Sequence, residues 1–149
     1  MHPRARDLIE TLHLTPHPEG GFYRQVVKSD RIVGGNRSAL TAIHFLLPRG
    51  DHSRWHRVSS DEIWVSLEGD GVSLHTFDGL SIESHEIHGH KFRNVPGGHW
   101  QAAEPLGDYA LVTCIVAPGF EYEDFTMMAG DESAIAHLRN VASSFTRLI

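Results

Sequence analysis

Short segments in which apolar or β-branched residues alternate with polar ones dominate the chain between its two ends. They cover residues 22–29, 38–47, 61–69, 72–77, 80–89 and 109–118. Successive side chains of a strand point to opposite faces, so this pattern is typical of strands with a buried face. Turn residues separate the segments at spacings of roughly 8–12 residues, and Asp78-Gly79 is a typical hairpin turn. The pattern predicts an all-β sandwich or barrel.

The two ends of the chain have helical periodicity instead. Residues 6–14 carry apolar side chains at helical spacing, and Pro16 would end that short helix. Residues 132–146 form a second apolar helical face, with Asp131 as a suitable N-cap. We expect this C-terminal helix to be a packing or dimer element.

Composition and charge narrow the class of protein. The chain has 149 residues, 40% hydrophobic and 21% charged, which fits one globular domain over residues 1–149. It contains neither an apolar run that could span a membrane nor a signal peptide, so we expect a cytoplasmic protein without a membrane partner. A net charge of -6 argues against a nucleic-acid partner. The single cysteine, Cys114, excludes an internal disulfide and lies in an apolar segment typical of a buried thiol.

The unusual feature of the composition is a count of 12 histidines, one of which stands in a specific pattern. Between Gly50 and Gly69, the residues His56, Val58 and Glu62 follow the spacing G-x5-H-x-V-x3-E-x6-G. This resembles the first motif of the cupin superfamily, in which position 58 is a second histidine. His56 and position 58 would share one face of a strand, and Glu62 would begin the partner strand and point into the same cavity.

A second stretch, VPGGHWQ at residues 95–101, resembles the core of the second cupin motif, P-x-G-x2-H. Pro96 and Gly98 match it, and Gln101 stands where that motif has its histidine. The turn at 96–98 would bring Gln101 into the barrel from another strand. Four side chains would then converge inside the barrel.

Longer matches make the resemblance more specific. The segments HPEGGFYRQ, SRWH, DEIW and WQAAEP, spread over nearly the whole chain, resemble the small cupin family DUF985, also called cupin 5. The resemblance implies an all-β cupin jelly-roll barrel with short N-terminal and C-terminal helices, usually assembled as a homodimer. It also suggests that the loop 17–21 reaches the cavity mouth and that Tyr23 matches an aromatic position of the family. Gln25 departs from the family, which usually has glutamate there.

The metal site that the cupin motifs imply is incomplete in this chain. A strong cupin site resembles three histidines and one glutamate, but Val58 cannot ligate and Gln101 offers only a neutral carbonyl oxygen. His56, Glu62 and Gln101 are therefore an incomplete ligand set. Two other residues that could supply a missing ligand are His44 and His99. We expect no resident cofactor, and at most weak binding of a divalent transition metal.

Without a metal, His56 and Glu62 form a hydrogen-bonded pair, either as a satisfied buried pair or as a catalytic one. Burial would raise the pKa of the Glu62 carboxyl, and the neighbouring carboxylate would favour the imidazolium form of His56. Such a pair can transfer protons near neutral pH. Residues that would bind the substrate are Tyr23, Ser53, Arg54, Trp64, Trp100 and Gln101. The acidic segment 121–125 is expected to be a solvated edge.

Three functions remain open at this point. The first is a metal-independent enzyme of the isomerase or epimerase type, acting on a small, polar, sugar-like molecule with His56 as base and Glu62 as orienting residue or acid. The second is a non-catalytic binding module whose aromatic-lined cavity holds a small ligand. The third is a weakly metal-dependent cupin enzyme. The partner in each case is a small molecule, and the sequence does not identify it.

Overall fold

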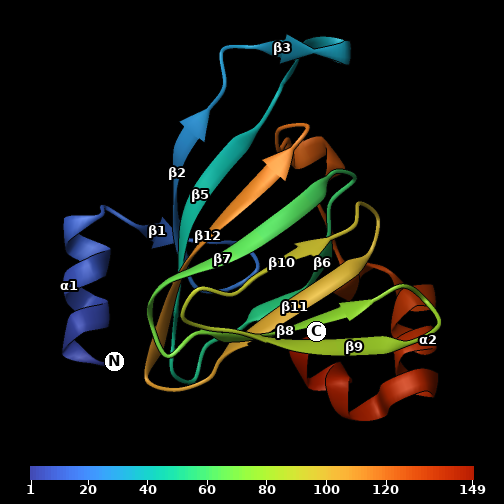
Figure 1. The fold of residues 1–149 in the computed structure, drawn as a ribbon. Helices are drawn as coiled ribbons and strands as arrows, with labels where there is room; N and C mark the ends of the chain where they lie inside the picture. Colours follow the sequence, from blue (N-terminus) through green and yellow to red (C-terminus); the bar gives the residue numbers. More distant parts are fainter.

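The computed structural model describes residues 1–149 and consists of two antiparallel β-sheets packed face to face, with one helix on the outer side of each sheet (Figure 1). The strands of the first sheet are, in spatial order, β1 (Thr15–Pro16), β2 (Phe22–Lys28), β5 (Thr41–Pro48), β12 (Tyr109–Ala117), β7 (Asp61–Gly69) and β10 (Phe92–Val95). The strands of the second sheet are β13 (Thr126–Met127), β6 (Ser53–Arg57), β11 (Trp100–Pro105), β8 (Val72–Phe77) and β9 (Ile82–Ile87). The predicted all-β jelly-roll barrel is confirmed.

The remaining elements lie outside these two sheets. They are α1 (Pro3–Thr11), α2 (Glu132–Ala142), the short hairpin β3 (Ile32–Val33) and β4 (Arg37–Ser38), and the 3-10 turns η1 (Gly34–Asn36), η2 (Tyr122–Asp124), η3 (Met128–Gly130) and η4 (Ser143–Leu148). The β3–β4 hairpin projects beyond the sheets at the top of Figure 1. Neither of the two α-helices is long and apolar enough to cross a membrane.

Apolar side chains fill the space between the sheets and also the space beneath each helix. Phe45 and Trp64 of the first sheet pack against Val72 and Leu74 of the second. On β5, Phe45 therefore points inward, whereas Leu46 points outward and packs beneath α1. Because β5 is buried on both faces, its sequence reads as a continuous apolar run.

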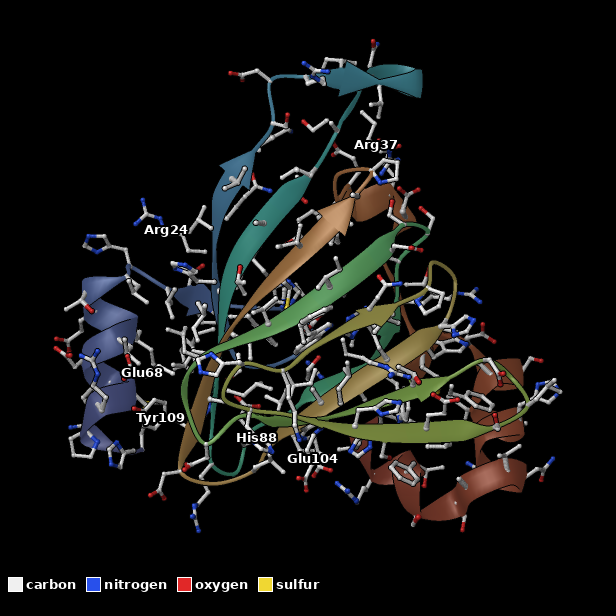
Figure 2. All side chains as sticks on the ribbon, viewed as in Figure 1. Arg24, Arg37, Glu68, His88, Glu104 and Tyr109 are labelled. Carbon is white, nitrogen blue, oxygen red and sulfur yellow. The ribbon has the colours of Figure 1, made fainter.

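Polar contacts fasten α1 to the outer face of the first sheet. Arg4 Nε donates to Glu68 Oε1 at 2.7 Å, and Tyr109 Oη donates to the same oxygen at 2.9 Å. Figure 2 shows Glu68 and Tyr109 beside this helix. The helix begins at Pro3 rather than at residue 6, because His2 Nδ1 accepts a hydrogen bond from the Arg4 backbone N–H and so caps it.

A β-bulge in β6 decides which side chains reach the interior of the barrel. Gln101 of β11 pairs with His56, and Ala103 pairs with Ser53, so three residue steps on β6 face two on β11. The extra residue lets Ser53 and His56 both reach the inner side although they are three residues apart. Trp55 turns to the outer side, where its Nε1 donates to the Phe145 carbonyl at 2.9 Å.

Two predicted elements differ from the structure. The strand expected over 38–47 begins at Thr41, because the chain before it forms the β3–β4 hairpin. The helix expected over 132–146 ends at Ala142, and the chain continues as the 3-10 turn η4. Asp131 caps this helix as predicted, with its Oδ1 accepting from the Ala134 N–H at 2.9 Å.

Candidate functional site

A cavity of about 120 Å³ opens between the two sheets, next to the segment 118–125. Most of its wall is apolar or aromatic and comes from β2, β5, β12 and that segment. The polar residues of the wall are His17, Glu19, Gln25, Thr41, His56 and Glu62. The cavity therefore combines a mainly apolar surface with buried ionisable side chains, among them Glu19, His56 and Glu62.

His56 has a single neutral tautomer that fits its surroundings. Its Nδ1 lies 2.7 Å from the carbonyl oxygen of Arg54, which can only accept, so Nδ1 carries the hydrogen. In the neutral ring Nε2 then has a free lone pair, and it lies 3.2 Å from Glu19 Oε2. Burial lowers the pKa of His56, although the neighbouring Glu62 carboxyl opposes that shift.

Glu19 is buried with a proton donor on one oxygen and two acceptors near the other. Ser53 Oγ donates to Oε1 at 2.7 Å. Oε2 lies 3.2 Å from His56 Nε2 and 3.5 Å from His17 Nδ1, which itself accepts from the Glu19 N–H. His17 Nδ1 and His56 Nε2 each present a lone pair to Oε2, which would repel an ionised carboxylate. A stable arrangement therefore requires one proton between Glu19 and His56.

The most stable place for that proton is Glu19. Burial raises the pKa of the Glu19 carboxyl to about 8, more than its hydrogen bond from Ser53 and the charge of Arg54 lower it. With His56 neutral, the contact of 3.2 Å is a hydrogen bond from protonated Glu19 to His56 Nε2 rather than an ion pair. The pair thus holds one transferable proton at the cavity wall.

Glu62 is held by a chain of hydrogen bonds that begins in the core. Trp64 Nε1 donates to Gln101 Oε1 at 2.8 Å, and Gln101 Nε2 donates to Glu62 Oε2 at 2.5 Å. Because the indole can only donate, it orients the Gln101 amide with its NH2 group toward the carboxyl. Burial raises the pKa of Glu62 to about 7; the charge of His56 and the hydrogen bonds from Gln101 and Cys114 partly oppose this rise.

The structure brings together three of the residues predicted from the sequence. His56, Glu62 and Tyr23 all line the cavity. The predicted direct hydrogen bond between His56 and Glu62 is wrong, because the His56 ring nitrogens face Arg54 and Glu19 and the Glu62 carboxyl faces Gln101.

Other predicted site residues lie behind or outside the wall. Gln101 and Trp64 stand behind Glu62 in the core. Ser53 holds Glu19, and Arg54 Nη2 donates to the Pro18 carbonyl at 2.6 Å, so these two residues position the loop 17–21. Trp100 packs beneath α2, in the same outer cluster as Trp55, so its expected position in the wall of the substrate cavity is wrong.

Two segments contribute more to the wall than their sequence predicts. The loop 17–21 reaches the cavity, as the resemblance of the HPEGG segment to the family suggests, and its Glu19 is the partner of His56, a role that the sequence did not indicate. The segment 121–125, expected to be a solvated edge, contributes Tyr122 and Phe125 to the cavity wall. The acids of this segment do not line the cavity, and Asp124 forms an ion pair with Arg37. Figure 2 shows Arg37 beside the end of β12. The aromatic residues that alternate with these acids were the feature of the sequence that could have indicated a buried side of this segment.

Two antiparallel sheets around a cavity, with His56 and Glu62 projecting into it from β6 and β7, define a cupin-type barrel. The sequence profile described as "Cupin superfamily (DUF985)" matches residues 6–128, and the chain belongs to this family.

Relatives agree with that assignment over most of their length. A hypothetical protein from Leishmania major is 31% identical, with a TM-score of 0.82, and the match covers 97% of this chain and 96% of the other. A protein from Shewanella oneidensis is 26% identical, with a TM-score of 0.83 and coverage of 97% and 93%. An uncharacterized protein of Saccharomyces cerevisiae is 25% identical over 160 residues, covering 89% of this chain and 79% of the yeast protein.

The residues at the cupin metal positions do not fit a metal ion. Val58 lines the cavity without a ligating atom. The Gln101 amide is bonded at both ends, to Trp64 and to Glu62. His44 points away from the cavity on β5 and His99 lies in a separate surface groove, so neither replaces the missing ligand. No group of three His, Cys, Asp or Glu side chains has the geometry of a metal site.

Proposed function

We propose that the protein is an enzyme that moves a proton on a small molecule without a metal, as in isomerisation or epimerisation. The observation that carries this proposal is the cluster of Glu19, His56 and Glu62 in the wall of an otherwise mainly apolar cavity. Burying a carboxyl costs free energy, and two carboxyls line this cavity although no lysine or arginine does. Groups whose pKa values are shifted toward neutrality at a cavity are typical of acid–base catalysis.

The geometry supports a division of roles that differs from the sequence-based one. His56 Nε2 already accepts the proton of Glu19, so His56 is not free to act as the first base. Glu62, with a pKa of about 7, is partly ionised at neutral pH and faces the cavity. In this proposal Glu62 removes a proton from the substrate, and the Glu19–His56 pair supplies one.

The size of the cavity limits what can enter it. A dry engineered cavity of about 150 Å³ holds one benzene molecule. The volume here, about 120 Å³, therefore fits about five non-hydrogen atoms. The substrate is either a molecule of that size or a larger one whose reactive end enters past Tyr122, which is 54% exposed at the mouth.

The test is hydrogen exchange from solvent. A mixture of small hydroxyaldehydes, hydroxyketones and sugars is incubated with the protein in heavy water, with and without a chelator, and deuterium in each compound is measured by mass spectrometry. We expect one compound to gain deuterium with or without chelator. Glu62→Gln should slow this exchange by about 100-fold or more, whereas Glu86→Gln, at an exposed carboxyl far from the cavity, should not. Exchange that stops in the presence of chelator would refute the metal-independent mechanism.

A second candidate, a non-catalytic module that binds a small ligand, is favoured by the aromatic part of the wall. Tyr23, Phe120, Tyr122 and Phe125 all line the cavity, and the hydroxyl oxygens of the two tyrosines lie 3.0 Å apart. Native mass spectrometry of freshly purified protein distinguishes the two: a co-purified compound that never exchanges hydrogen would support the binding module.

A further inference from the structure

His17 is a residue of the cavity wall to which the proposed proton transfer assigns no role. Its side chain is 6% exposed, and its ring lines the cavity. Three aromatic rings meet it edge-to-face, with centroid distances of 4.4 Å to Tyr23, 5.8 Å to Phe45 and 6.0 Å to Phe125. These contacts hold the imidazole in one orientation.

Hydrogen bonding sets the tautomer of this ring. The backbone N–H of Glu19 donates to His17 Nδ1 at 3.2 Å, so Nδ1 has no hydrogen of its own. A neutral imidazole then carries its hydrogen on Nε2. Burial, together with the charge of His56, lowers the pKa of His17 to about 3, so the ring stays neutral around pH 7.

The Nε2–H group of His17 is left without a partner in the protein. No hydrogen bond or ion pair involves this atom. The only fully enclosed polar side-chain atom without a hydrogen bond belongs to Asp124, so His17 Nε2 retains contact with open space. For a ring that lines the cavity, that space is the cavity itself. A donor of fixed orientation is therefore available to a ligand.

The charges of the wall restrict the acceptor that this donor can meet. No lysine or arginine lines the cavity, and two carboxyls, Glu19 and Glu62, do. An anionic group such as a carboxylate or phosphate would lie near these acids without a countercharge, which is costly in an enclosed site. A neutral carbonyl oxygen needs only a neutral donor, which His17 offers.

We propose, on the basis of the proton-transfer function above, that the substrate is a neutral aldehyde or ketone whose carbonyl oxygen accepts a hydrogen bond from His17 Nε2, while Glu62 removes a proton from the adjacent carbon. The C–H bond breaks and its electron pair forms a carbon–carbon double bond. The π pair of the carbonyl moves onto oxygen, and the proton goes to the Glu62 carboxylate. His17 keeps its Nε2 hydrogen and stabilises the enolate oxygen. Return of a proton to the same carbon completes an exchange or an epimerisation.

Binding of hydroxyacetone tests the role of His17 separately from catalysis. It is neutral and small enough for the cavity, and pyruvate is an anionic control of similar size. Both are labelled with ¹³C at the ketone carbon, and the carbonyl stretch and the dissociation constant are measured for the wild type, His17→Phe and His17→Gln. Phenylalanine keeps the ring contacts and removes the donor, whereas glutamine keeps a donor.

We expect hydroxyacetone to bind the wild type with a lowered carbonyl stretch, and pyruvate to bind much more weakly. His17→Phe should abolish the shift of the stretch and weaken binding about five- to ten-fold, the loss of one hydrogen bond. His17→Gln should restore part of both. If His17→Phe does not fold, the wild type still gives the answer, because the Nε2-bound proton of His17 should move downfield in the NMR spectrum when hydroxyacetone binds.

The outcomes separate the two proposals. Equal binding to the wild type and a folded His17→Phe, an unmoved Nε2 proton, tighter binding of pyruvate, or no binding of hydroxyacetone would each overturn the assignment of His17. Binding with the expected His17 dependence, but without exchange of the hydroxyacetone α-hydrogens in heavy water, would support His17 as the carbonyl donor and count against the proton-transfer function.

Discussion

Replacing Glu62 with glutamine should change how the stability of the protein depends on pH. Burial raises the pKa of this carboxyl from its ordinary 4.5 to about 7. A group that binds its proton more tightly in the folded state stabilises that state below pH 4.5, and this stabilisation is lost as the pH rises through about 7. Each pKa unit corresponds to about 1.4 kcal/mol, so the full loss is on the order of 3 kcal/mol. Glutamine has nothing to ionise and should avoid it.

The comparison of the two proteins cancels most of the contribution of the other buried groups. Glu19, whose pKa is raised to about 8, and His17, whose pKa is lowered to about 3, are present in both proteins. The pKa of His56 is lowered in both and falls further in the variant, because the Glu62 charge that raises it is lost, and this change has the same sign as the expected difference. Urea unfolding is followed by tryptophan fluorescence at pH 5, 6, 7 and 8. The free energy of unfolding of Glu62→Gln relative to the wild type should increase by about 2 to 3 kcal/mol from pH 5 to pH 8.

A matched variant controls for the loss of a carboxyl elsewhere. Glu86 lies on β9 with a side chain that is 64% exposed, and Glu86→Gln should follow the wild-type pH profile. Parallel profiles of the wild type and Glu62→Gln would refute the reasoning, because they would mean that Glu62 titrates as a solvated carboxyl does. The buried environment and the proposed catalytic role would then both be wrong.

Three further predictions concern the supports of the site. Gly20→Ala should cost about 3 kcal/mol or more of stability in thermal unfolding, because Gly20 has a φ of +108° and an added Cβ would lie 2.1 Å from the His52 carbonyl oxygen; a melting temperature like that of the wild type would contradict this. Trp64→Phe should cost about 1–3 kcal/mol in urea unfolding because it leaves the buried Gln101 Oε1 without a donor; an unchanged midpoint would show that water or another donor replaces the indole. Micromolar Fe²⁺, Mn²⁺ or Ni²⁺ should leave the melting temperature unchanged, since no group of three His, Cys, Asp or Glu side chains has the geometry to hold a metal ion; a metal-dependent rise would reveal a ligand set that the geometry does not contain.

The fold was largely predictable because its signals are local. Alternating apolar residues and turn residues indicated the strands, and β7, β8 and β12 lie within a residue of the predicted ranges. His56 and Glu62 both line the cavity, as the resemblance of their spacing to the cupin motif implied.

The details of the site depend on contacts that no local pattern contains. The bulge in β6 changes which residues face inward, and it is visible only in the pairing with β11. Glu19 meets His56 across 37 positions of sequence because the loop 17–21 folds over the end of β6, held by Arg54. Trp100, predicted to bind the substrate, lies in the outer core beneath α2 instead, because an apolar residue can be buried in either of two cores and its sequence does not specify which.

The hydrogen-bond chain from Trp64 through Gln101 to Glu62 also makes it difficult to convert this barrel into a metal-binding one by single mutations. Restoring the cupin histidines would require Val58→His and Gln101→His. The second change replaces the amide oxygen that accepts from the buried indole with an imidazole, and an imidazole that coordinates a metal has no lone pair left for the indole N–H, so the metal-bound intermediate would carry an unpaired polar group in its core. A further change at Trp64 would be needed to relieve that penalty. Directed evolution toward a metalloenzyme should therefore proceed through simultaneous rather than single substitutions at these three positions.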